Sequence, residues 1–143
     1  MISVLLERLT NVLNFEYDGH FTWDEHTVYE DEVAAYIEAG NKGTDLPYSD
    51  IGRHQATHKS KEYHIARVVW FVINPEEIKG IAIDNLCGSD CIYPKAIIED
   101  GHHRFMAAQI LKMDKIKIEY SGREDIERYL QGKRKNPPKN VLR

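Results

Sequence analysis

Hydrophobic positions recur at helical spacing near the start of the chain, which predicts a helix over residues 2–14. Its apolar face comprises Ile2, Leu5, Leu6, Leu9, Val12 and Leu13. Glu7 and Arg8 fall inside this pattern, so the segment is expected to be an amphipathic helix and not a signal peptide.

A second helix is predicted from about residue 27 to residue 39. Thr27 and Glu30 have the spacing of a capping box, and Gly40 follows the expected end of the helix. Residues 41–62 are polar and interrupted by glycine and proline, so they are predicted to form a long loop. Long loops in small domains often carry function or lack fixed structure.

The pattern then changes to a nearly continuous apolar run from Ile65 to Ile73, rich in β-branched residues. This run predicts a central strand that is buried on both faces. Asn74 and Pro75 indicate the start of a short helical turn. Residues 81–83 are a candidate short strand, and residues 88–90 are a candidate turn.

Two strand–helix pairs are predicted in the last third of the chain. A strand over residues 93–99 precedes a helix over residues 103–113, and an alternating strand over residues 116–120 follows. Ser121 and Glu124 would cap a last helix that ends near residue 132. This order predicts a compact α/β (α+β) domain in which helices pack on a small mixed sheet, with an extra N-terminal helical region.

Composition supports one soluble domain, because 143 residues with 42% hydrophobic and 29% charged residues are typical of a globular core. Two cysteines do not make a disulfide framework, and a reducing, cytoplasmic location is expected. No apolar run approaches the roughly 20 residues that span a bilayer, so no membrane partner is expected. The formal charge of −4 argues against broad nucleic-acid binding by phosphate neutralisation.

Charge is unevenly distributed along the chain. Residues 18–50 are acidic, and such a surface would suit binding to a host protein at a site that normally takes a polyanion. Residues 133–143 are basic and would either remain a solvated tail or contact a polyanion such as DNA.

The strongest candidate for chemistry is the turn Asp100-Gly101-His102-His103-Arg104. A buried strand is predicted to end at a glycine, which allows a tight turn and a close approach of ligand to backbone. A helix begins at once, so its first amides are unpaired and its positive dipole end favours an anion. The two histidines and the arginine add donors for a phosphate. The alternative is a capped helix whose histidines satisfy local hydrogen bonds.

Residues 97–108, IIEDGHHRFMAA, resemble the signature of the ParB/sulfiredoxin superfamily. The Asp-Gly-His-His-Arg form is most similar to the ADP-dependent free-serine kinases of this fold and to small phage and plasmid proteins. In several of these a His-x-Ala-Arg strand, here His64 to Arg67, comes before the turn, and a strand ending in Ser-Gly, here Ser121-Gly122, comes after it. The resemblance covers residues 63–122.

The chain departs from two branches of this superfamily. His102 stands where the sulfiredoxins carry their reactive cysteine, so reductase activity is not expected. Only about 20 residues follow Ser121-Gly122, too few for the helix-turn-helix domain of partition proteins, so centromere-type partition is not expected either.

The kinase-like resemblance implies a nucleotide site that uses ADP or ATP with Mg²⁺. The amides of Gly101 to His103, the side chains of His102, His103 and Arg104, and Arg67 would hold phosphates. Asp100 would help to hold Mg²⁺. Glu76 or Glu77 would act as a general base, with His103 as a further catalytic residue. The simpler alternative for Glu76 and Glu77 is favourable charge at a helix N-terminus.

Other polar groups were weighed for the same site and for metal. In a strand His64 and Arg67 face opposite sides, so at most one of them would reach the turn, and Arg67 is favoured because a buried arginine needs an anion. Cys87 and Cys91 have a spacing that zinc allows, but no second pair stands at suitable spacing. His54 and His58, with His64 nearby, could bind a metal if the stretch were helical, but Gly52 and the polar surroundings favour a loop.

The sequence thus predicts an extension over residues 1–62, a core over residues 63–132 and a basic tail over residues 133–143. Three functions remain open, in this order. The first is a nucleotide-dependent phosphotransferase or phosphohydrolase that binds a nucleotide or phosphorylated small molecule. The second is a DNA-binding or nuclease-like module, and the third is a non-enzymatic effector that binds a host protein.

Overall fold

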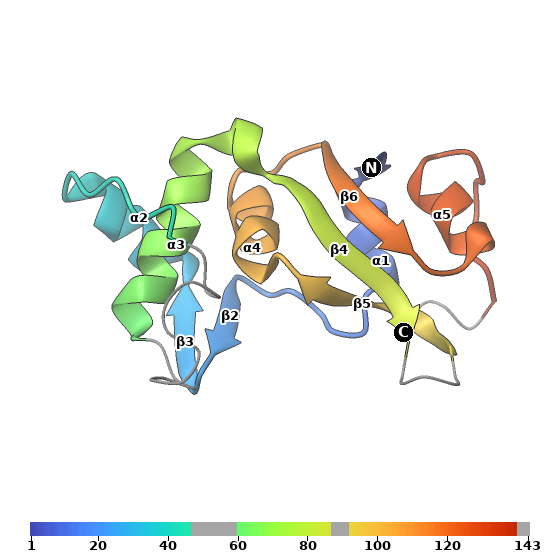
Figure 1. Cartoon of the computed structure of the whole chain (residues 1–143), viewed down its shortest axis with the longest axis horizontal. Helices are drawn as coiled ribbons and strands as arrows, with labels where there is room; N and C mark the ends of the chain where they lie inside the picture. Colours follow the sequence, from blue (N-terminus) through green and yellow to red (C-terminus); the bar gives the residue numbers. More distant parts are fainter. Residues whose placement is uncertain (47–59, 87–91, 140–143) are drawn as a thin grey trace.

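A four-stranded sheet, a separate two-stranded hairpin and five α-helices make up the described part of the chain, residues 1–46, 60–86 and 92–139 of a computed structural model (Figure 1). The predicted mixed α/β fold class is therefore confirmed. None of the helices in these residues is both long enough and apolar enough to span a bilayer.

The large sheet has the strand order β1-β6-β4-β5. These strands are β1 (Ile2–Leu5), β6 (Lys115–Ser121), β4 (Lys79–Leu86) and β5 (Ile92–Asp100). β4 and β6 run parallel, and the two outer pairs are antiparallel. Along β6 the buried Ile116 and Ile118 alternate with the exposed Lys115 and Lys117. One face of the sheet is therefore covered, and the other meets solvent.

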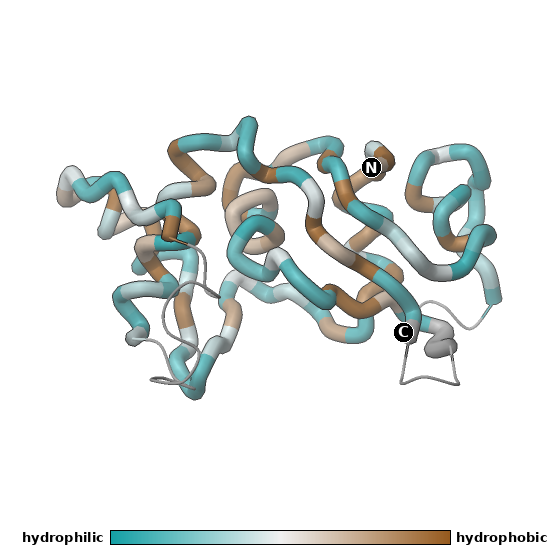
Figure 2. Tube along the Cα trace, viewed as in Figure 1, coloured by the Kyte–Doolittle hydropathy of each residue, from teal (hydrophilic) through white to brown (hydrophobic). Residues whose placement is uncertain are grey.

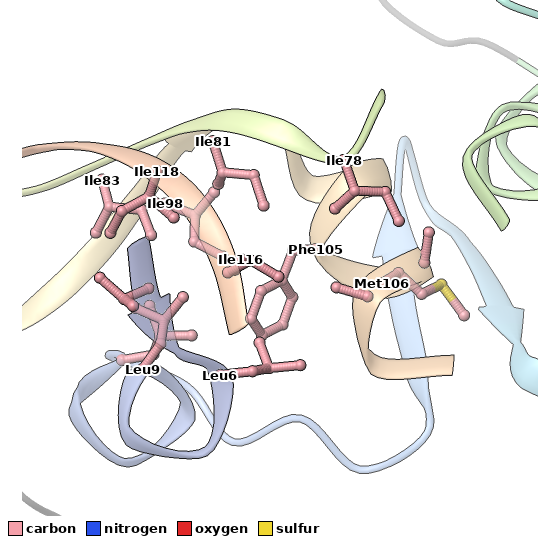
Figure 3. Packing of buried hydrophobic residues seen from close by; sticks show 14 of the residues in the cluster. Leu6, Leu9, Ile78, Ile81, Ile83, Ile98, Phe105, Met106, Ile116 and Ile118 are labelled. Atoms are coloured by element: carbon pink, nitrogen blue, oxygen red, sulfur yellow. The ribbon is translucent and has the colours of Figure 1, made fainter. Parts of the chain in front are cut away.

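The core lies between the covered face of the sheet and the helices α1 (Leu6–Val12) and α4 (His102–Ile110). Figure 3 shows Leu6 and Leu9 of α1 and Phe105 of α4 pointing toward isoleucines of the sheet. α5 (Glu124–Leu130) adds Ile126 and Leu130 to the same cluster. Burial of this apolar surface is the main force that holds the helices on the sheet.

A second layer lies on the far side of α4 from the sheet (Figure 1). It consists of the hairpin β2 (His20–Trp23) and β3 (His26–Tyr29), followed by α2 (Glu30–Glu38) and α3 (Lys61–Ile73). α3 contacts α4, α2 and β3, so it is the element that joins this layer to the core.

The predicted strand over residues 65–73 is wrong, because these residues belong to α3. The helix is capped by Ser60, whose Oγ accepts a hydrogen bond from the amide of Tyr63 at 3.1 Å. Its apolar run is nearly continuous because α3 is covered on more than one side, by α4 and by α2 with β3. A buried helix and a buried strand give the same pattern over such a run.

The predicted helix over residues 2–14 is only partly correct. Residues 2–5 form β1, which pairs with β6, and the helix begins at Leu6. The apolar residues at its start are buried as an edge strand, where Val4 points into the core. The proposed boundary at residue 62 stays a prediction, although β1 contributes a strand to the sheet of the proposed core.

Both predicted capping boxes are wrong. Thr27 lies within β3, and α2 begins at Glu30, with the amide of Tyr29 donating to Glu32 Oε1 at 3.0 Å. Ser121 is the last residue of β6, and α5 begins after Arg123. In each case the residue is of a type that often caps a helix, but here it lies in a strand and pairs with the neighbouring strand instead.

The remaining predicted elements are largely confirmed. The strands over residues 81–83, 93–99 and 116–120 appear as β4, β5 and β6, and α4 covers most of the helix predicted over 103–113. Pro75 opens a single 3₁₀ turn, η2 (Pro75–Glu77), whose preceding Asn74 side chain donates to Trp70 O. Of the predicted loop, residues 41–46 have no regular structure, whereas residues 47–59 and the turn at 88–90 lie outside the described residues.

Candidate functional site

The turn between β5 and α4 has the strand–glycine–helix geometry that the sequence predicts. Gly101 has φ +102° and directly precedes α4. A Cβ atom at this position would lie 3.1–3.2 Å from three guanidinium atoms of Arg104. Glycine is therefore needed both for the backbone conformation and because Arg104 folds back across the turn.

Arg104 connects the ends of two strands. Its Nη1 donates to the carbonyl oxygen of Lys79 at 2.6 Å, and its Nη2 donates to Asp100 Oδ2 at 3.3 Å. The Asp100 carboxylate is 80% exposed, so this ion pair is open to water and weak. An incoming anion can therefore compete with Asp100 for the guanidinium, which the Lys79 carbonyl keeps in place.

Three elements meet at a buried chain of polar side chains. Nδ1 of His64, on α3, lies 2.9 Å from Nε2 of His103, on α4. Nε2 of His64 lies 3.0 Å from Oδ2 of Asp24, in the turn of the β2–β3 hairpin. The side chain of His64 is fully buried, and that of Asp24 is 13% exposed. We call this series Asp24–His64–His103 the histidine chain.

Aromatic rings fix the orientation of the two imidazoles. The Trp23 ring stacks on His103 at a centroid distance of 4.4 Å and on His64 at 5.2 Å, within 1° and 11° of parallel. The Tyr63 ring is steeply inclined to both imidazoles, with centroid distances of 5.4 Å to His64 and 6.1 Å to His103. A flat, apolar wall of this kind leaves each imidazole little freedom to rotate.

The hydrogen bonds of the histidine chain determine where its protons lie. Burial in the first place, and then the nearby His64, Arg67, His102 and Arg104, lower the pKa of His103 well below 6.5. For two neutral rings, the tautomers that satisfy both contacts have Nε2 of His64 donating to Asp24 and Nε2 of His103 donating to Nδ1 of His64. In these tautomers Nδ1 of His103 carries no hydrogen and can accept one.

Arg67 follows His64 on the same face of α3, because residues three apart in a helix are neighbours. The strand on which the expectation for these two residues rested is therefore wrong, and a contact of Arg67 with the turn stays a prediction. The guanidinium lies 4.5 Å from the centre of the Phe71 ring, and its Nη1 is 3.5 Å from the carbonyl oxygen of Thr44. Burial in the first place, and to a lesser extent the charge of Arg104, lower the pKa of Arg67.

Three other predicted site residues, His102, Glu76 and Glu77, are not part of the histidine chain. The His102 ring packs against Phe21 at 5.1 Å, and burial lowers its pKa. Glu76 and Glu77 are exposed on η2, and neither forms an ion pair within the described ranges. A catalytic role for either glutamate stays a prediction.

Asp24 and Trp23 are the residues that sequence reasoning missed. Asp24 and the following residue, Glu25, have φ values of +48° and +70°, as in a two-residue hairpin turn of type I′. The usual sequence signal for such a turn pairs aspartate or asparagine with glycine, and Asp24-Glu25 lacks the glycine. The sequence therefore gives little signal for the turn and none for its contact with His64.

Metal binding stays untested at the predicted positions. In the part of the chain that the structure describes, no group of three histidine, cysteine, aspartate or glutamate residues is placed to hold a metal ion. The cysteine pair Cys87 and Cys91, and His54 and His58, fall outside the described residues. The proposed Mg²⁺ contact of Asp100 needs phosphate oxygens as further ligands, as is usual for this ion.

Comparisons with family models, with curated proteins and with solved structures find no match to this chain. The function must therefore be argued from the geometry of the histidine chain and its surroundings.

The lowered pKa of His103 predicts how stability depends on pH. The unfolded chain binds a proton at this histidine near pH 6.5, whereas the folded protein does so only at lower pH. The contribution of His103 to stability should therefore be complete above about pH 6.5 and decrease below it, by up to about 1.4 kcal/mol per pH unit.

Urea unfolding of the wild type and of His103→Gln between about pH 7.5 and about pH 5.5 checks this. Glutamine can still donate a hydrogen bond to His64, but it does not titrate. The variant should lose less stability over this range than the wild type. Equal losses in both proteins would contradict the assignment.

Proposed function

We propose that this chain binds a phosphate-bearing ligand, in the first place a nucleotide, at the N-terminus of α4, and that it transfers or hydrolyses a phosphoryl group there. The observation that carries the proposal is the histidine chain, which ends at His103 in the first turn of α4, next in sequence to Arg104. Free amides, two cations and a proton acceptor with a carboxylate behind it are the components that phosphoryl transfer uses.

Binding would use groups that are already in position. The first amides of α4 have no partner within the helix and can donate to an anion, and Arg104 is held by the Lys79 carbonyl while it pairs only weakly with Asp100. A phosphate would replace Asp100 on the guanidinium, with two parallel hydrogen bonds in reach. Asp100 would then be free to hold Mg²⁺ beside the phosphates, as predicted from the sequence.

Proton transfer would follow the histidine chain. Nδ1 of His103 accepts the proton of the attacking hydroxyl or water, and Nε2 of His103 passes its own proton to Nδ1 of His64. The positive charge then rests on His64, whose Nε2–H donates to Asp24. The carboxylate stabilises this imidazolium, as the aspartate of a catalytic triad does. No net proton is created or lost in these steps.

Membership of the ParB/sulfiredoxin superfamily and a cytoplasmic location are part of this proposal. Both rest on sequence features, namely the Asp-Gly-His-His-Arg turn and the small number of cysteines. Residues 64–67 are helical, whereas the resemblance implies a strand there, so the proposed membership rests on the Asp-Gly-His-His-Arg turn alone.

Isothermal titration with ADP, ATP and CTP, each with and without Mg²⁺, tests the proposal. We expect at least one nucleotide to bind, and we expect Arg67→Gln and Arg104→Gln to weaken binding by about 10-fold or more, since each removes a charged hydrogen bond. Arg128→Gln is the matched control, because Arg128 is exposed on α5 and should leave affinity unchanged. Absence of heat with every nucleotide at millimolar concentration would overturn the proposal.

A further inference from the structure

A groove of about 470 Å³ opens on the solvent-facing side of the sheet, where β1, β4 and β6 lie next to η2. Three lysines line it, Lys79 at the start of β4 and Lys115 and Lys117 on β6. All three are exposed. Figure 2 shows the strands of this region alternating between hydrophobic and hydrophilic positions, as expected for a sheet with one open face. We call this feature the lysine groove.

Strand register concentrates the positive charge. Lys79 is the partner of Lys117 across the parallel β4–β6 pair, and Ser3 is the partner of Lys117 across the β1–β6 pair. Lys115 lies two residues before Lys117 on the same face of β6. Like charges that face each other across strands destabilise a sheet. A bound anion would remove this repulsion.

Few carboxylates lie beside these lysines. Among the residues that the structure describes, none of the three lysines forms a salt bridge. Glu76 is the one acidic residue among the described residues that line the groove, and Glu119 follows Lys117 on the same face of β6. The net charge of the chain is −4, so this surface differs in sign from the molecule as a whole.

Only the backbone of Lys79 takes part in the α4 turn. Its carbonyl oxygen accepts the hydrogen bond from Arg104, while its side chain lines the groove. None of the residues of the turn is among the described residues that line the groove. Successive residues on one face of a strand are about 6.6–6.8 Å apart, so Lys115 and Lys117 are too far apart to serve one phosphate group equally.

We propose that the lysine groove binds the phosphodiester backbone of a nucleic acid single strand. Several lysines in a row on an open surface fit a ligand with repeated charges, because lysine acts as a flexible point charge and does not define the shape of one small anion. The lysine groove is distinct from the nucleotide site proposed at α4. The proposal for the groove therefore holds whether or not a nucleotide binds at α4.

Fluorescence anisotropy with a labelled single-stranded DNA of about 20 nucleotides, at about 50 and about 200 mM salt, tests this. The triple variant Lys79→Gln, Lys115→Gln, Lys117→Gln should bind about 10-fold more weakly or worse at low salt. For this variant the slope of log K against log salt should be shallower by about 2, since each of the three lost phosphate contacts on a single strand contributes about 0.7 to the slope. Lys42→Gln, which removes one exposed lysine outside the groove, should bind like the wild type.

Two further measurements make the outcome unambiguous. The triple variant should have a thermal midpoint no lower than that of the wild type, because the repulsion between Lys79 and Lys117 is gone, and it should keep the nucleotide affinity of the wild type, which separates this proposal from the one for α4. Deleting residues 133–143 tests whether the basic tail is the binding surface instead. Wild-type affinity in the triple variant, loss of binding only on deletion of the tail, or no binding of the wild type at low salt would each overturn the proposal.

Discussion

Asp24→Asn should lower the rate of phosphoryl transfer or hydrolysis by about 10²-fold or more, while nucleotide affinity changes little. Asparagine has the shape of aspartate and tolerates the left-handed backbone at φ +48°. Its side-chain oxygen can still accept the hydrogen bond from His64 Nε2. The variant therefore removes the negative charge that stabilises the His64 imidazolium and leaves the geometry in place.

Phosphate release, measured with the nucleotide that titration identifies and at saturating concentration, checks this prediction. Glu25→Gln is the matched control, because it removes the same charge from the neighbouring residue of the same turn. The control should keep the wild-type rate. Equal rates in Asp24→Asn and Glu25→Gln would show that the carboxylate of Asp24 takes no part in proton transfer.

The pH dependence of the rate separates a role in proton transfer from a role in folding. In the wild type the rate should decrease only below about pH 6.5, because the pKa of His103 is already lowered by burial. Loss of the Asp24 charge makes the protonated histidine chain less favourable, so the decrease should move to still lower pH in Asp24→Asn. A variant that was merely less stable would lose activity without this shift.

Local sequence signals account for the parts of the fold that were predicted correctly. The alternation at residues 116–120 and the sequence Asp100-Gly101-His102 each depend on a few neighbouring residues. Alternation with a period of two reflects the geometry of a strand, and a glycine before a helix reflects the geometry of a tight turn. Both depend only on the backbone of a few neighbouring residues. The β5–α4 turn was therefore located to within a residue or two.

The assignment of α3 failed because the deciding factor is tertiary. The run from Ile65 to Ile73 is apolar on nearly all sides because three elements cover it, and such a run has no helical period to detect. Its 13-residue extent, including Lys61 to His64, is more typical of a helix than of a strand. The error mattered for the site, because only a helix brings His64 and Arg67 to one face.

Asp24 could not be predicted as part of the site for a related reason. It is separated from His64 by 40 positions, and His64 from His103 by 39. The contacts form only because α3 packs between the hairpin and α4. The sequence supplied each residue of the histidine chain, but the order in which they bond follows from the packing of three elements.

Gly43→Ala should lower the free energy of unfolding by about 3 kcal/mol or more, a large effect for a glycine-to-alanine substitution. Gly43 has φ +79°, and a Cβ atom there would lie 2.3 Å from the carbonyl oxygen of Ala66 and 2.5 Å from the amide nitrogen of Trp70. Both are backbone atoms of α3, so relief of the contact requires that the segment or the whole helix moves. Such movement would also disturb the neighbouring hydrogen bond from the Thr44 amide to Ala66 O.

Gly40→Ala is the matched control for urea unfolding of this variant. Gly40 has φ +90°, but a Cβ atom there would meet nothing within 4 Å. Its replacement should cost only the left-handed conformation, about 1–2 kcal/mol. The difference between the two variants therefore measures the close approach of residue 43 to α3. Because α3 carries His64 and Arg67, Gly43→Ala should also weaken nucleotide binding, whereas Gly40→Ala should not; equal stabilities in the two variants would mean that the segment yields freely and does not position the helix.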